Sequence, residues 1–78
     1  MLIRSKDKKK IVDALHVYVG SEVGSKRKYV FAGFAGRSFF HTNEESMGVY
    51  ESEQEALDQI NKMVDYFNGN PNGVYELE

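Results

Sequence analysis

Cysteine is the most informative absence from this chain of 78 residues. Without cysteine, neither a disulfide nor a thiolate metal site can form. Tryptophan is also absent, and Pro71 is the only proline. A membrane-spanning helix needs about 20 apolar residues, and the apolar runs of this chain are far shorter. The first residues, MLIRSKDKKK, lack the apolar stretch of a signal peptide. Together these absences predict a cytoplasmic protein.

The composition is that of a folded chain. Hydrophobic residues make up 41% and charged residues 28% of the sequence, which is typical of globular domains. The length fits one domain, and a domain this small buries only about 60% of its unfolded surface. We expect this single domain to span residues 1–76. The last two residues, Leu77 and Glu78, resemble a vector-derived tail.

Charge of each sign is concentrated in one half of the chain. Residues 1–40 carry nine Lys and Arg against three Asp and Glu, a balance of +6. Residues 41–78 carry one Lys against nine Asp and Glu, a balance of −8. The total is −2. Such asymmetry suits either a basic binding surface or two halves that attract each other.

Short strands dominate the predicted secondary structure. Residues 11–19 alternate, with one apolar face that should turn inward (Ile11, Leu15, Val17 and Val19) and with His16 and Tyr18 on the other face. Residues 28–35 are apolar on both faces, which indicates a central strand. The sequence TNEE at 42–45 reads as a turn. We expect strands at 2–5, 11–19, 28–35, 38–41, 47–50 and 74–77.

One helix is expected, from Ser52 to Asn68. Ser52 and Glu55 form the S-x-x-E pattern of a helix-capping box. The apolar residues that follow recur at helical spacing on one face: Ala56, Leu57, Ile60, Met63, Val64 and Phe67. Such a stripe has to be buried, and the sheet is the one surface available. The predicted class is therefore α+β: a small antiparallel sheet of four to six short strands with the helix packed on one face.

Two motifs carry a resemblance to a known group of proteins. Ile3, Arg4 and Ser5 match the opening M-I-I-R-S, and a later pattern G-x-Y-x-S-E-x-x-A enters the helix. Its matching residues are Gly48, Tyr50, Ser52, Glu53 and Ala56. With these motifs the chain resembles short uncharacterised proteins of Gram-positive bacteria, their phages and mobile elements. The resemblance covers about a third of the chain, implies a bacterial cytosolic protein, and implies no catalytic residue.

The stretch YVFAGFAGRSFF at 29–40 concentrates aromatic residues and glycines. It partly matches the RNA-recognition signature, at Gly33, Phe34, Ala35 and Phe39. Gly36 stands where that signature has a second base-stacking aromatic residue. The G-x-x-G at 33–36 is flanked by predicted strands, whereas the RNA-binding clamp of that spacing joins helices. We therefore interpret the stretch as a strand, a turn and a second strand.

Nucleic-acid binding is the alternative that the charge asymmetry keeps open. Basic residues cluster in two predicted loops, 6–10 and 26–28, next to a sheet that carries aromatic residues. Single-strand binders combine such cations with stacking rings. The candidate residues are Lys6, Lys8, Lys9, Lys10, Lys26, Arg27 and Lys28. Lysines in turns also keep sheets from associating, which is the simpler explanation.

Catalytic patterns are weak. His16 and His41 fall in different predicted strands and could hold a metal with Glu44 or Glu45 only if the sheet brings them together. Surface histidines without a ligand are the commoner case. The sequence has neither a phosphate-loop motif nor a dinucleotide-binding motif. We expect no enzymatic activity, no cofactor and no metal.

The sequence therefore favours a small, non-catalytic protein-interaction module. A sheet with more aromatic residues than one helix can cover leaves a contact surface on its other face. We expect Tyr18, Tyr29, Phe31 and Phe39 to form this protein interface. The partner is a second copy of the chain or another protein.

Overall fold

The computed structural model describes residues 1–35 and 43–78, which form six strands and one helix. The strand expected at 38–41 lies outside the described residues. The sequence suggests a turn at 42–45, but residues 43–45 begin a long strand, so the turn is wrong for these described residues. The elements are β1 (Leu2–Arg4), β2 (Ile11–Asp13), β3 (His16–Gly20), β4 (Lys28–Phe34), β5 (Asn43–Tyr50), α1 (Glu53–Gly69) and β6 (Val74–Glu76).

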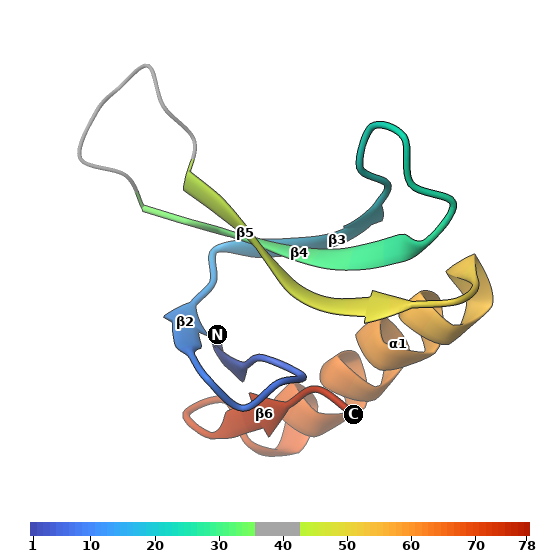
Figure 1. Ribbon diagram of the computed structural model, residues 1–78. Helices are drawn as coiled ribbons and strands as arrows, with labels where there is room; N and C mark the ends of the chain where they lie inside the picture. The colour runs from blue at the N-terminus through green and yellow to red at the C-terminus, as the bar shows by residue number, and fades with distance from the viewer. Residues whose placement is uncertain (36–42) are drawn as a thin grey trace.

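The strands form two sheets of three, in the orders β2-β1-β6 and β3-β4-β5. In the first sheet, β1 pairs antiparallel with β2 and parallel with β6. In the second, β4 pairs antiparallel with both neighbours, as expected for a central strand. The two sheets lie one above the other in Figure 1, and α1 runs diagonally below the sheet β3-β4-β5. The α+β class is confirmed, with two small sheets in place of one.

The segment expected as one strand at 11–19 bends between Asp13 and His16 and passes from the first sheet into the second. Val12 and Ala14 point inward before the bend, whereas Val17 and Val19 point inward after it. The inward positions therefore change from even to odd residue numbers. Leu15, expected on the inward face, is 70% exposed. A continuous strand would keep one parity throughout, so the bend explains the error.

The core lies between the two sheets and the helix. Large side chains such as Ile3, Met47 and Leu77 fill it, and three alanines let the layers approach closely. On the sheet β3-β4-β5, Val30, Ala32 and Met47 are at most 2% exposed. The buried hydrophobic residues are Ile3, Ala14, Val30, Ala32, Met47, Tyr50, Ala56, Met63, Tyr75 and Leu77.

The helix begins as the capping box predicts. The Ser52 hydroxyl oxygen accepts from the Glu55 backbone N–H at 3.2 Å. The Glu55 carboxylate in turn accepts from the Glu51 N–H at 3.1 Å, which gives a second free donor a partner. The predicted apolar stripe is only partly buried, because Leu57 and Val64 are 40% and 55% exposed.

A buried glutamine, Gln59, ties the helix to the end of the chain. Its side-chain oxygen accepts from the Tyr75 hydroxyl at 3.0 Å and from the Glu78 backbone N–H at 3.1 Å. Leu77, expected as part of a tail, is fully buried, and its N–H donates to the Arg4 carbonyl at 3.1 Å. Leu77 therefore belongs to the folded unit, and the domain extends past residue 76.

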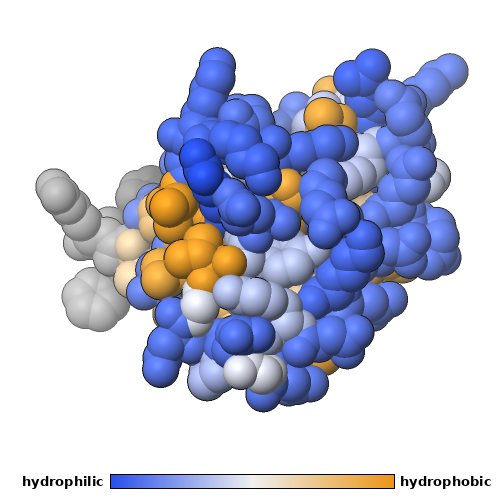
Figure 2. Space-filling view, turned by 90° about the horizontal axis from the view of Figure 1, so that it is seen from below, coloured by the Kyte–Doolittle hydropathy of each residue, from blue (hydrophilic) through white to orange (hydrophobic). Residues whose placement is uncertain are grey.

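The outward side of the sheet β2-β1-β6 is a mixed surface. Leu2, Ile11 and Val74 are exposed there, and Figure 2 shows apolar side chains gathered on this side within a largely hydrophilic surface. Arg4 and Glu76 cross the same side with an ion pair of 2.9 Å. Across the described part of the chain, the helix is neither long nor apolar enough to span a bilayer.

Candidate functional site: the aromatic face of the second sheet

The sheet β3-β4-β5 has an inner face, packed against α1 and the core, and an outer face on the opposite side. Side chains of successive strand residues alternate between faces. Because Val17 and Val30 pack inward, the alternate residues of β3 and β4 point outward. In the strand register, His16 pairs with Gly33, Tyr18 with Phe31, and Gly20 with Tyr29. These six positions, with Glu44 of β5, make up what we call the outer face.

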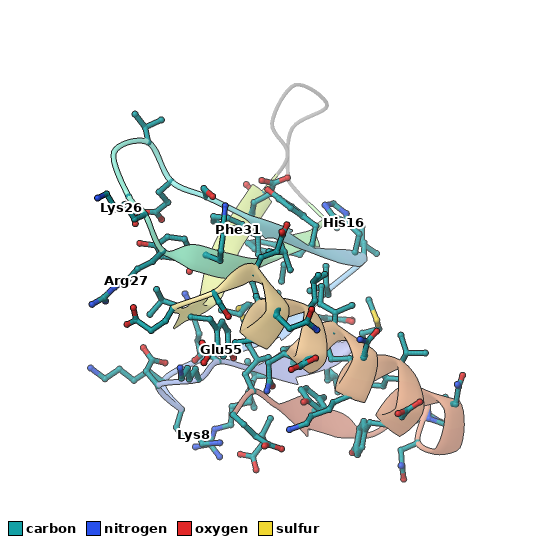
Figure 3. The ribbon with its side chains drawn as sticks, turned by 90° about the vertical axis from the view of Figure 1, so that its right-hand side faces the viewer. Lys8, His16, Lys26, Arg27, Phe31 and Glu55 are labelled. Atoms are coloured by element: carbon teal, nitrogen blue, oxygen red, sulfur yellow. The ribbon has the colours of Figure 1, made fainter. Side chains whose placement is uncertain are left out.

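Four rings form a continuous row across the outer face. The Tyr18 and Phe31 rings stack with centroids 5.3 Å apart. Tyr29 extends the row at 5.8 Å from Phe31, and His16 extends it at 6.0 Å from Tyr18. These separations lie in the range in which aromatic pairs attract each other. The row spans two strands, with Phe31 and His16 both above the helix in Figure 3.

Two glycines make room for this row. A side chain on Gly33 would meet the His16 ring, with a Cβ only 2.1 Å from Cε1 of that ring. A Cβ on Gly20 would lie 3.1 Å from the Phe31 ring. Rings that cover a cross-strand glycine protect the backbone that glycine leaves bare. Gly33 therefore serves the ring row directly, a role that the pattern of 29–40 does not reveal.

Glu44 closes one end of the row. Its carboxylate accepts a hydrogen bond from the Tyr18 hydroxyl, and its other oxygen lies 3.8 Å from Nε2 of His16. Glu44 pairs in register with Gly33, so no side chain stands between the carboxylate and β3. The hydrogen bond to Glu44, followed by burial, raises the pKa of Tyr18 above its ordinary value. A phenol that donates to a carboxylate holds its proton more tightly.

The predicted interface residues are largely brought together. Tyr18, Tyr29 and Phe31 are neighbours on the outer face and are half-buried. Phe39 lies outside the described residues. The alternation in 16–19 already groups His16 with Tyr18. Glu44 was missed because the sequence places it in a turn, and only its position in β5 brings it to the face.

The basic cluster at 6–10 is largely engaged with acidic groups and the backbone. Lys8 and Lys10 lie 3.7 Å from Glu76 and 3.0 Å from Glu45, respectively. Nζ of Lys6 donates to the Val49 carbonyl at 2.9 Å and lies 4.2 Å from the Tyr50 ring centroid, so this lysine braces β5. Lys9 is exposed. The cluster belongs to the turn between β1 and β2, away from the outer face.

The second basic cluster lies at the end of the loop between β3 and β4 and includes Lys28, the first residue of β4. Lys28 donates to the Ser21 hydroxyl at 2.9 Å, and Nε of Arg27 lies 3.7 Å from Glu51. Lys26 is exposed, and within the described ranges it forms no ion pair. Figure 3 shows Lys26 and Arg27 together at one end of the sheet and Lys8 well below them. The two basic clusters therefore do not merge into one surface.

A metal centre gains little support from the geometry. His16 and Glu44 do meet, as the metal hypothesis requires, while His41 lies outside the described residues. No group of three or more His, Cys, Asp or Glu suited to a metal ion occurs among residues 1–35 and 43–78.

Comparison with known proteins adds no assignment. No family model, no curated protein and no solved structure matches this chain. The function must therefore be argued from the outer face itself.

Proposed function

We propose that this protein is a non-catalytic protein-interaction module whose contact surface is the outer face. The observation that carries the proposal is the row formed by His16, Tyr18, Phe31 and Tyr29, which no described segment covers. Aromatic residues are enriched in protein interfaces because they bury much area at a small cost in side-chain entropy. A small domain with four adjacent rings on its surface fits this role.

The polar groups of the face fit a protein partner better than a nucleic acid. Glu44 lies at one end of the row, and a carboxylate repels phosphates. Most cations of the basic loops already contact carboxylates, a hydroxyl or a carbonyl. Of the three cations in the cluster at 26–28, Lys26 is the one whose side chain forms neither an ion pair nor a hydrogen bond in the described part of the chain. Single-strand binding through the basic loops therefore stays a secondary hypothesis.

Site-specific photo-cross-linking in the native cells tests the proposal. A photoreactive phenylalanine analogue replaces Phe31, and the matched control carries it at Leu2, which points outward from the other sheet. We expect a protease-sensitive adduct with another polypeptide at position 31 and none at position 2. Equal adducts at both positions, or none at position 31, would count against the proposal.

The nucleic-acid alternative has its own test. Backbone amide shifts are followed while short single-stranded DNA or RNA is added, first at low and then at moderate salt. Because phosphate contacts weaken with salt, genuine binding gives salt-sensitive shifts at Lys26, Arg27 and Tyr29. We expect none of these shifts. A nuclease-sensitive adduct at position 31 together with such shifts would replace the protein partner by a nucleic acid.

A further inference from the structure

β3 is an edge strand without the usual protection. Its sequence, HVYVG, contains no lysine, no carboxylate and no proline. The other edges are guarded: β2 carries Asp13 and β6 carries Glu76, while β5 carries Glu44 and Glu45 and shifts register against Val30 and Phe31. Charges and bulges at sheet edges prevent pairing with other chains. An edge that lacks them is open to a further strand.

An apolar groove runs beside this edge. It is a hollow of about 350 Å³ between β3 and α1. Its lining includes Val17 from the strand and Ile60, Val64 and Phe67 from the helix. Val64 is 55% exposed, and Leu57, two turns earlier on the same stripe, is 40% exposed. The helix therefore presents apolar side chains on the side where β3 has no neighbour.

We propose that two copies of this chain associate through these edges, with β3 of one copy paired antiparallel to β3 of the other. The strand sequence is self-complementary around Tyr18. A two-fold axis at Tyr18 places Val17 of each copy opposite Val19 of the other, and His16 opposite Gly20. Directly opposed β-branched pairs stabilise antiparallel sheets, and a two-fold axis uses the same patch on both copies.

The charges near β3 agree with a second copy as the occupant. The loop that carries Lys26 follows Gly20, and it rises on the side of the sheet away from α1 (Figure 1). The His16 end of β3 carries the Glu44 carboxylate on that same side. Antiparallel pairing brings the Lys26 loop of each copy to the Glu44 corner of the other. Opposite charges thus meet twice, which favours this orientation.

The helices complete the interface. α1 presents Glu53, Leu57, Val64 and Asn68 toward the β3 side, because these residues share one helical face. The two-fold axis makes the helices antiparallel, so Leu57 of one copy faces Val64 of the other. Glu53 then lies across from Asn68 and not from a second Glu53, so the acidic helix starts stay apart. The groove of each copy is closed by the helix of its partner.

This inference concerns the edge of the sheet and goes beyond the proposed function, which concerns its outer face. Pairing at β3 joins the β3-β4-β5 sheet of one copy to that of the other in a single sheet of six strands. The ring rows of the two copies then lie side by side. The outer face stays open in the dimer. A monomer that still binds a partner through the outer face would contradict the dimer alone. A dimer that binds no other protein would contradict the proposed function alone.

Sedimentation over a wide concentration range gives the first test. We expect a concentration-dependent dimer whose dissociation constant rises at least about tenfold in Leu57→Lys and in Val64→Lys, since each places a charge in the apolar contact. Leu2→Lys and Val74→Lys are matched controls, because these residues are 37% and 38% exposed on the other sheet. A chain that stays monomeric up to about 1 mM, or a dimer that the controls weaken equally, overturns the proposal.

Cysteine cross-linking gives the second test and reads the geometry directly. Because the chain has no cysteine, Tyr18→Cys introduces a single thiol at the two-fold axis. Opposed strand residues come close enough for a disulfide, so mild oxidation should convert this variant to a covalent dimer. Ser46→Cys, on the β5 edge strand, is the control. Cross-linking at position 46 as fast as at position 18, or none at position 18, excludes β3 pairing.

Discussion

The inner and outer faces of the sheet β3-β4-β5 are built by the same strands from different kinds of side chain. The inner face carries Val17, Val19, Val30 and Ala32, which are small and aliphatic. The outer face carries four rings and a carboxylate. Aromatic residues are not excluded from the interior, because Tyr66 and Phe67 of α1 and Tyr75 of β6 pack edge-on or tilted against one another. The rings of Tyr18, Tyr29 and Phe31 are outside because strand alternation places them there, opposite the helix.

The difference separates folding from recognition within one sheet. Close approach of the helix requires small residues on the inner face, since α1 brings Ala56 and Met63 against them. The outer face contributes less to the core and is therefore free to carry binding groups. Substitutions on the inner face should change stability, whereas those on the outer face should change contacts with other molecules.

The largest expected effect is on the inner face. Met47→Ala should lower the free energy of unfolding by about 2–5 kcal/mol, because it leaves a cavity in a core that cannot collapse freely. Phe31→Leu on the outer face keeps most of the apolar volume and loses only ring contacts, about 1 kcal/mol. Urea unfolding followed by circular dichroism measures both. Equal losses would mean that the outer face is part of the core.

A smaller effect is expected from the tyrosine on the inner side. Burial, with further contributions from Tyr75 and Glu78, raises the pKa of Tyr50 to about 12. A phenol whose pKa is raised in the folded state stabilises the fold fully below pH 10, and this stabilisation is lost as the pH rises from 10 towards 12.

Tyr50→Phe removes that titration together with the hydrogen bond to the Glu78 carbonyl. It should cost about 1 kcal/mol at neutral pH and make the unfolding free energy less dependent on pH above 10. Thermal unfolding at a series of alkaline pH values measures this. If the unfolding free energy of the variant falls as steeply above pH 10 as that of the unchanged protein, groups other than Tyr50 cause the loss of stability at alkaline pH.

The smallest effect is expected from the acidic end of the outer face. Glu44→Gln removes the charge that holds the proton on Tyr18, so the pKa of Tyr18 should fall toward its ordinary value. Stability should change little, since exposed charge pairs contribute about 0–1 kcal/mol. Tyrosinate absorbance during alkaline titration provides the measurement.

The neighbouring substitution Glu45→Gln is the control for this titration. Glu45 pairs with Lys10 at 3.0 Å and faces the other side of the same strand. The Glu45→Gln substitution should therefore leave the titration of Tyr18 unchanged. A shift of equal size in both variants would point to general charge effects and not to the hydrogen bond.

The helix and the central strand could be predicted from sequence because their signals are local. Ser52 and Glu55 lie one turn apart. In β4, consecutive residues after Lys28 are apolar, as expected for a strand that is covered on both faces. The bend before His16 could not be predicted, since alternation over 11–19 is consistent with one straight strand. The Asn43–Tyr50 strand was missed in its first half because Asn43, Glu44 and Glu45 have low strand propensity. Pairing with β4 overrides that propensity.

The outer face was predictable in part. Period-two spacing groups His16 with Tyr18 and Tyr29 with Phe31, but it does not say which group faces the helix. That choice depends on Val30 and Ala32 fitting beneath α1, which is a tertiary effect. The exposure of Leu57 and Val64 could not be predicted either. Helical periodicity shows which residues form the apolar stripe, but not how much of the stripe the sheet covers.

The pairing of β1 with β6 sets the order in which this protein can fold. β1 lies between β2 and β6, and Leu77 enters the core directly after β6. The parallel partner of Ile3 is Tyr75, so β1 completes its pairing only when a strand far along the sequence reaches it. Such distant pairing slows folding. The interior is therefore expected to close as a single late event, when β6 docks beside β1.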